Sequence, residues 1–153
     1  MKLIRKRGFG FGLVSGIITT LGVMIGLYSV TNSKMAVLVG ILSVAVADAF
    51  SDALGIHLSE ESSGKKMHSK IWKETFLTFF SKLFFALIFV LPVLLFELEL
   101  AMVLGIILSI LILSIFSYKV AVFRGDNPFV KILEHISITI LVVLITYFLG
   151  KLF

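Results

Sequence analysis

Residues 47–62 read ADAFSDALGIHLSEES and end a long apolar run that starts near Met35. Asp48 and Asp52 stand four residues apart inside this run, so a helix would place both carboxylates on one face, about 6 Å apart. An acidic side chain within a membrane-spanning helix costs roughly 3 kcal/mol and usually marks a functional site. The pair therefore predicts a functional site. The structural alternative is that basic partners neutralise both acids and only fix the packing of the helices.

The composition is that of a membrane protein. The chain has 153 residues, of which 59% are hydrophobic, and its mean hydropathy is +1.12. It has no cysteine, which excludes a disulfide framework and a thiolate metal site. Any metal would be held by oxygen, imidazole or thioether groups, which suit Mn²⁺ or Fe²⁺ better than Cu⁺. The sequence has no phosphate-binding loop, nucleophile triad or nucleic-acid-binding motif, so we expect neither an enzyme nor a nucleic-acid partner.

Five apolar segments each approach the roughly 20 residues that a bilayer requires. We predict an all-α, polytopic membrane domain covering residues 1–153, with transmembrane helices at about 9–30, 35–58, 72–96, 100–118 and 129–149. Residues 59–71 and 119–128 are predicted as polar loops, and Pro92 is expected to bend the third helix. The glycine-rich first helix favours close helix packing in lipid.

Lysine and arginine gather on one side of this topology. Four precede the first span, four lie in the second loop or at the start of the third span, and three lie in the fourth loop or at the start of the fifth span. The other side has only Lys34 and Lys151. The amino terminus is therefore predicted in the cytoplasm and the carboxyl terminus outside. We expect a multi-pass membrane protein, located in the plasma membrane if the cell is prokaryotic, whose basic second loop meets anionic lipid.

The polar side chains converge on the cytoplasmic half of the predicted bundle. The candidate metal ligands are Asp48, Asp52, His57, Glu60 and Glu61. The candidate pathway-lining residues are Ser15, Gly16, Ser51, Gly55 and Ser59, and Glu134 and His135 are placed at the cytoplasmic entrance. This convergence suits a cation pathway loaded from the cytoplasm. His57 has the alternative role of an interfacial histidine.

Lys82 is the one lysine or arginine well inside a predicted span, away from its ends. Its depth matches that of Asp48, and an unpaired charge there would be costly, so we predict an Asp48–Lys82 ion pair. Asp52 would then be free to exchange a proton for a metal, with Ser15, Ser51 and Glu60 as further oxygen ligands. The alternative is that Lys82 repels cations.

Several segments resemble the vacuolar iron transporter family. Gly12 to Leu27 (GLVSGIITTLGVMIGL) resembles the first helix of that family, and residues 47–62 resemble its second. Pro92 matches the proline of the third helix, and residues 123–153 are similar to the last loop and helix. The family's first-helix acid falls on Ser15 and its second-helix methionine on Asp52. The family's large cytoplasmic metal-binding helices are reduced to the short loop, in which Glu60, Glu61 and His68 remain.

The resemblance implies transport of Fe²⁺ or Mn²⁺ out of the cytosol by proton exchange, with the metal as substrate and no resident cofactor. It also implies a homodimer with the pathway between the subunits. We expect the first and second helices near the two-fold axis, with Gly16 and Gly22 facing the partner.

Two other classes of protein stay open. One is a membrane scaffold in which Lys82 locks both aspartates, and the other is a membrane-embedded enzyme with Asp48 and Asp52 as metal ligands. The enzyme would need further acidic repeats.

Overall fold

The computed structural model describes residues 6–64 and 67–153. Within these residues the chain is helical and contains no strand. The helices are α1 (Arg7–Thr31), α2 (Lys34–Ser62), α3 (His68–Leu87), α4 (Val90–Leu95), α5 (Leu98–Arg124) and α6 (Pro128–Lys151). Since α3 and α4 together make one span, five helical segments in the described chain are long and apolar enough to cross a membrane. The predicted all-α, five-span fold is confirmed.

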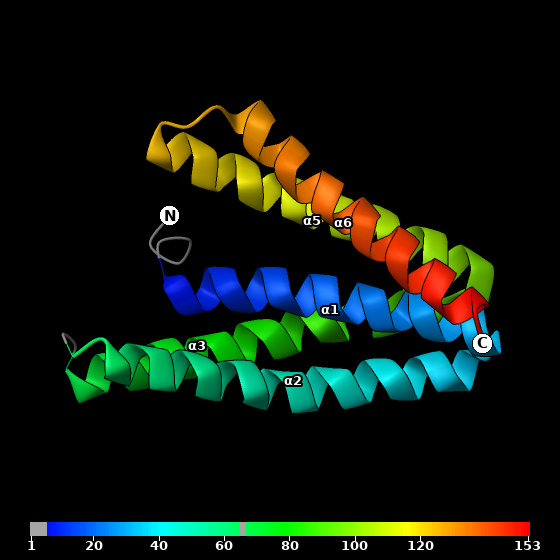
Figure 1. Cartoon of the computed structure of the whole chain (residues 1–153), viewed down its shortest axis with the longest axis horizontal. Helices are drawn as coiled ribbons and strands as arrows, with labels where there is room; N and C mark the ends of the chain where they lie inside the picture. Colours follow the sequence, from blue (N-terminus) through cyan, green and yellow to red (C-terminus); the bar gives the residue numbers. More distant parts are fainter. Residues whose placement is uncertain (1–5, 65–66) are drawn as a thin grey trace.

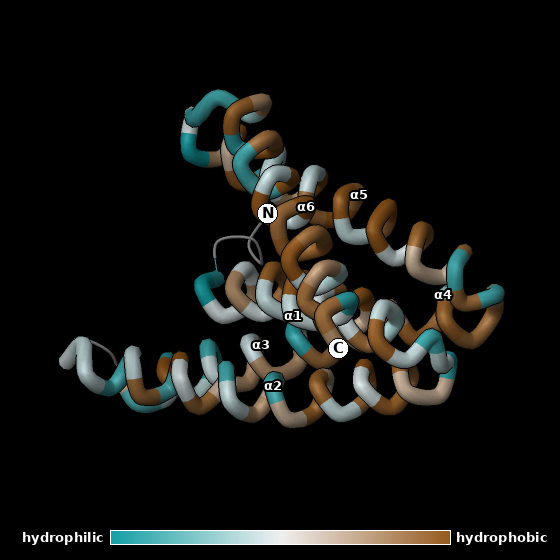
Figure 2. The backbone as a smooth tube through the Cα atoms, turned by 45° about the vertical axis from the view of Figure 1, so that its right-hand side comes forward, coloured by the Kyte–Doolittle hydropathy of each residue, from teal (hydrophilic) through white to brown (hydrophobic). Residues whose placement is uncertain are grey.

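The spans run alternately between two ends of the bundle (Figure 1). The start of α1 lies at the same end as the α2–α3 and α5–α6 connections, whereas the carboxyl terminus lies at the opposite end (Figure 1). Hydrophilic residues gather at the ends of the helices, and α5 is hydrophobic along most of its length (Figure 2). This arrangement agrees with an odd number of spans. Which end faces the cytoplasm stays a prediction.

Three helices extend further than predicted, because residues within the predicted loops are buried in the bundle. α2 continues to Ser62 and α3 begins at His68, so most of the predicted loop 59–71 is helical. Glu60 and Ile71, which lie in that predicted loop, are both buried. α5 likewise continues to Arg124, where Gly125, with a φ of 76°, ends it in the left-handed conformation. The predicted loop 119–128 is thus reduced to the turn before α6.

The third span is broken where Pro92 was expected to bend it. α3 ends at Leu87 and α4 begins at Val90. Proline has no backbone N–H and its ring clashes with the carbonyl four residues earlier, here that of Ile88. At the far end of α4, Lys34 Nζ donates to the carbonyls of Leu94 (3.2 Å) and Phe96 (3.0 Å). These bonds satisfy carbonyls that a helix end leaves without a partner.

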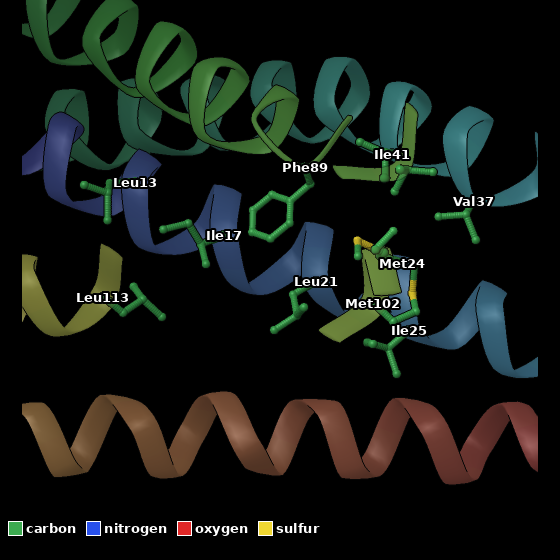
Figure 3. Packing of buried hydrophobic residues seen from close by; sticks show 12 residues of the cluster. Leu13, Ile17, Leu21, Met24, Ile25, Val37, Ile41, Phe89, Met102 and Leu113 are labelled. Carbon is green, nitrogen blue, oxygen red and sulfur yellow. The ribbon is translucent and has the colours of Figure 1, made fainter. Parts of the chain in front are cut away.

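α1 forms the centre of the bundle and packs against α2, α3, α5 and α6. Its buried side chains Leu13, Ile17 and Leu21 belong to the same core cluster as Phe89 of the third span (Figure 3). The outer faces of the bundle carry large exposed apolar side chains, such as those of Phe80 and Leu111. The core therefore surrounds α1, and the outside suits contact with lipid.

Glycines let α1 and α3 approach closely. A Cβ atom added to Gly12 would lie 2.1 Å from Ser81 Oγ and 2.6 Å from the carbonyl oxygen of Thr78. At Gly16 it would lie 2.7 Å from the carbonyl oxygen of Lys82. Gly22 is also buried, against α6. Close packing through small residues is as predicted. The partner lies within the same chain, however, so Gly16 and Gly22 do not face a second subunit.

Candidate functional site

α1, α2 and α3 together build a charged cluster, which consists of Ser15, Asp48, Asp52 and Lys82. Lys82 is 1% exposed, and its Nζ lies 2.5 Å from Asp48 Oδ2 and also contacts Asp52 Oδ2. Lys82 Nζ donates to Ser15 Oγ at 2.7 Å, and Ser15 Oγ donates to Asp52 Oδ2 at 2.7 Å. Three oxygen atoms from two helices thus surround one ammonium group.

The Asp48–Lys82 ion pair is present as predicted, but the prediction that Asp52 stands free is wrong. Asp48 and Asp52 lie one turn apart on the face of α2 that meets α3, so both carboxylates reach the same ammonium group. The small residues Ala45, Ala49 and Ala53 are buried beside them and let α2 pack closely. Sequence spacing predicted one partner for Lys82, whereas the packing of three helices gives it two.

The cluster lies deep in the helices. Asp52 is ten residues from the end of α2, which is about 15 Å along the helix axis. Lys82 is fourteen residues from the start of α3, or about 21 Å. Both distances are longer than those to the ends of the predicted spans, because α2 and α3 extend beyond residues 58 and 72. The charges therefore lie in the part of the bundle that would be surrounded by hydrocarbon.

The charges of the cluster do not balance. With all three groups ionised, two carboxylates and one ammonium leave one negative charge in excess. Uncompensated charge is costly in a low-dielectric interior, so this excess calls for a cation or a proton. The side chains of Asp48 and Asp52 are 27% and 18% exposed, whereas that of Lys82 is 1% exposed. The acids are therefore the accessible part of the cluster.

His57, Glu60 and Glu61 lie nearer the end of α2, where they have partners of their own. His57 Nδ1 lies 2.9 Å from Thr75 Oγ1, and its Nε2 lies 3.5 Å from Glu61 Oε1. The imidazole also packs against the Trp72 ring, with centroids 4.7 Å apart. Glu60 is buried, with its Oε1 3.6 Å from Arg7 Nη1. These contacts hold His57 between α2 and α3.

The other candidates lie apart from the charged cluster. Ser51, Gly55 and Ser59 are exposed on α2, and no atom outside the helix backbone lies near a Cβ built on Gly55. Glu134 is exposed on α6, and its Oε2 accepts a 2.8 Å hydrogen bond from Lys131 Nζ. His135 Nδ1 lies 2.8 Å from the carbonyl oxygen of Lys131. The structure therefore brings Ser15, but not these residues, into contact with the acids of α2.

Sequence reasoning missed Glu74, whose carboxylate caps α1. Glu74 Oε2 accepts the backbone N–H of Gly8 at 2.8 Å, and Oε1 lies 3.9 Å from Lys6 Nζ. A carboxylate at a helix amino terminus is stabilised by the free N–H groups and by the helix dipole. Its only sequence signal was an acid within the first turns of the predicted third span, which reads as an interfacial charge.

The described residues contain no group of three or more His, Asp or Glu side chains placed to hold a metal ion. In the charged cluster, two acids already share a lysine within the part of the chain that the structure describes. Five apolar spans define a multi-pass membrane protein, and charges inside such a bundle mark its candidate functional site.

Comparison with known proteins identifies the family. Residues 56–151, more than half of the chain, match the model of the VIT family, and the chain belongs to this family of vacuolar iron transporters. The family is one of membrane metal transporters, and this general function applies to the chain. No curated protein matches it. The matched segment contains Lys82, whereas Ser15, Asp48 and Asp52 precede it.

Proposed function

We propose that the protein moves Fe²⁺ or Mn²⁺ out of the cytosol in exchange for protons, as a homodimer. The observation that carries this proposal is the excess negative charge of the charged cluster, buried among three membrane spans. Both acids are partly accessible, and the cluster offers carboxylate and hydroxyl oxygens, which hard divalent cations prefer. A metal bound between Asp48 and Asp52 would neutralise the excess charge.

Metal ions and protons would compete for the same carboxylates, and this competition would couple metal transport to proton transport. Carboxylates bind a metal only when deprotonated, so a proton on Asp48 or Asp52 would release the metal, and metal binding would release the proton. Lower pH on the loading side should therefore weaken metal binding. The predicted orientation places the Glu60 and Glu61 end of α2 in the cytoplasm. Metal would then enter past these acids and leave on the opposite side.

An exposed stripe on α2 supports the homodimer. The residues at every fourth position are small and exposed, namely Ser43, Ala47, Ser51, Gly55 and Ser59. Small residues at this spacing let helices associate closely in lipid. Asp48 and Asp52 each follow a member of this stripe directly in sequence. A partner packed there would place the acids beside the subunit interface, with Ser51, Gly55 and Ser59 lining the pathway.

Metal uptake into proteoliposomes tests the proposal. Mn²⁺, Fe²⁺, Co²⁺ and Zn²⁺ would be compared, with and without a pH gradient across the vesicle membrane. We expect uptake of Mn²⁺ and Fe²⁺ that increases when the acidic side is opposite the loading side. Uptake of none of these metals would contradict the proposed function. Uptake that does not depend on the pH gradient would contradict proton exchange but not metal transport.

A scaffold is the second candidate, and the contact of Lys82 with both aspartates favours it. In a scaffold the charged cluster would only fix the packing of α1, α2 and α3. Such a protein would show no uptake of any metal, and its thermal stability would not respond to divalent cations.

A further inference from the structure

We propose that the Lys82 ammonium group is a tethered cation that occupies the metal position between Asp48 and Asp52, so that a transported metal must displace it. This inference rests on the proposed function and deepens it. It assigns Lys82 the role of setting how tightly the site holds a divalent cation.

The contacts of Lys82 Nζ mark a position suited to a cation. Three oxygens converge on this one atom, namely Asp48 Oδ2, Asp52 Oδ2 and Ser15 Oγ. Carboxylate and hydroxyl oxygens are the donors that Mn²⁺ and Fe²⁺ accept. The Ser15 hydroxyl donates its own proton to Asp52 and so turns a lone pair toward the ammonium group. The ammonium group therefore lies where a metal would find most of its protein ligands.

The side chain of Lys82 is the part of this residue that can move. Its backbone is held against α1, since a Cβ atom on Gly16 would come within 2.7 Å of the Lys82 carbonyl oxygen. The side chain has four rotatable bonds and ends in a compact charge. A metal that reaches the partly exposed acids would thus meet a positive charge. This charge can move out of the site while α1 and α3 remain packed.

Such a tethered cation would limit metal affinity. An arriving divalent ion has to overcome both the occupied volume and the positive charge of the ammonium group. After the metal leaves, the same group can return to the acids and cover their charge. A transporter must release its substrate, so moderate affinity serves transport. Without Lys82, the three oxygens would form a tighter and more permanent metal site.

The test measures Mn²⁺ binding to the purified protein in lipid nanodiscs by the electron paramagnetic resonance signal of free Mn²⁺. Lys82→Ala removes both the charge and the volume, and we expect it to bind Mn²⁺ at least tenfold more tightly than the unchanged protein. Lys82→Arg keeps the charge and should not gain affinity. Lys73→Ala is the matched control, because Lys73 is an exposed lysine on the same helix outside the charged cluster. Equal or weaker binding by Lys82→Ala would overturn the inference.

A second comparison covers the case in which Lys82→Ala does not fold. Asp48→Asn leaves one aspartate beside Lys82, and the double variant Asp48→Asn with Lys82→Met leaves one aspartate and no ammonium group. The double variant should bind Mn²⁺ more tightly than Asp48→Asn alone, and a lower affinity would overturn the inference. Binding decides this point independently of transport. Metal uptake by the unchanged protein without tighter binding by the Lys82 variants would reject the tethered cation and leave the proposed function standing.

Discussion

At the scale of single residues, Lys82 holds two acids at once. Lys82→Met leaves the partly exposed Asp48 and Asp52 without their cation, and removing one partner of a buried ion pair typically costs about 3–5 kcal/mol. We expect a clear fall in the thermal unfolding temperature of Lys82→Met in the absence of divalent metal. Adding Asp48→Asn should recover part of the loss, because one of the two uncompensated charges is then gone. A double variant as unstable as the single one would show that the two residues are not energetically coupled.

The pairing of these residues also shows where sequence reasoning ends. The matching depths of Asp48 and Lys82 were sufficient to predict their ion pair, because an unpaired membrane charge needs a partner. The contacts of Lys82 with Asp52 and Ser15 depend on how three helices are rotated about their axes, which spacing along one chain does not determine. The cap that Glu74 provides to α1 depends on the same packing.

At the scale of helices, the approach of α1 to α3 positions the charged cluster. Gly12→Ala would place a methyl group 2.6 Å from the Thr78 carbonyl oxygen, and such overpacking typically costs about 1–3 kcal/mol. We expect a lower unfolding temperature for this variant. Gly26→Ala is the control on the same helix, since its added methyl group would make only an ordinary van der Waals contact with Thr146, 3.9 Å away, and alanine favours a helix. Equal effects of the two substitutions would contradict the close α1–α3 contact.

Helix boundaries were less predictable than helix number. Apolar length alone identified the five spans, and the proline predicted a bend in the third span, where the structure has a break between α3 and α4. The ends of α2 and α5 were missed because polar residues there suggested loops. In the structure, Glu60 and Ala121 are buried within the segments predicted as loops, so these segments remain helical. Tertiary burial thus extended helices that local composition would have ended.

At the scale of the whole molecule, the absence of cysteine makes the predicted orientation easy to test. Ser62→Cys and Glu99→Cys each introduce one exposed thiol, at opposite ends of the bundle. With the amino terminus in the cytoplasm, a membrane-impermeant maleimide added to intact cells should label Glu99→Cys and leave Ser62→Cys unlabelled. Disrupting the cells should make both positions reactive. The reverse labelling pattern would invert the predicted orientation.

The proposed homodimer can be tested in the same way. Ser51→Cys lies in the exposed stripe of small residues on α2, and it should form disulfide-linked dimers under mild oxidation in native membranes. Ile145→Cys is the control, because this position is exposed on α6. Crosslinking at Ile145 but not at Ser51 would place the subunit contact elsewhere, and no crosslinking at either position would argue against the dimer along α2.

The central claim is that the acids of the charged cluster carry the metal, and Mn²⁺ uptake into proteoliposomes by Asp52→Asn tests it most directly. Asp52→Asn keeps the shape of the side chain, and Lys82 keeps its contact with Asp48, so the protein should remain folded. We expect the unchanged protein to take up Mn²⁺ and the variant to lose uptake, because the remaining carboxylate is neutralised by the lysine. Full Mn²⁺ uptake by Asp52→Asn, with an unchanged dependence on pH, would contradict the account.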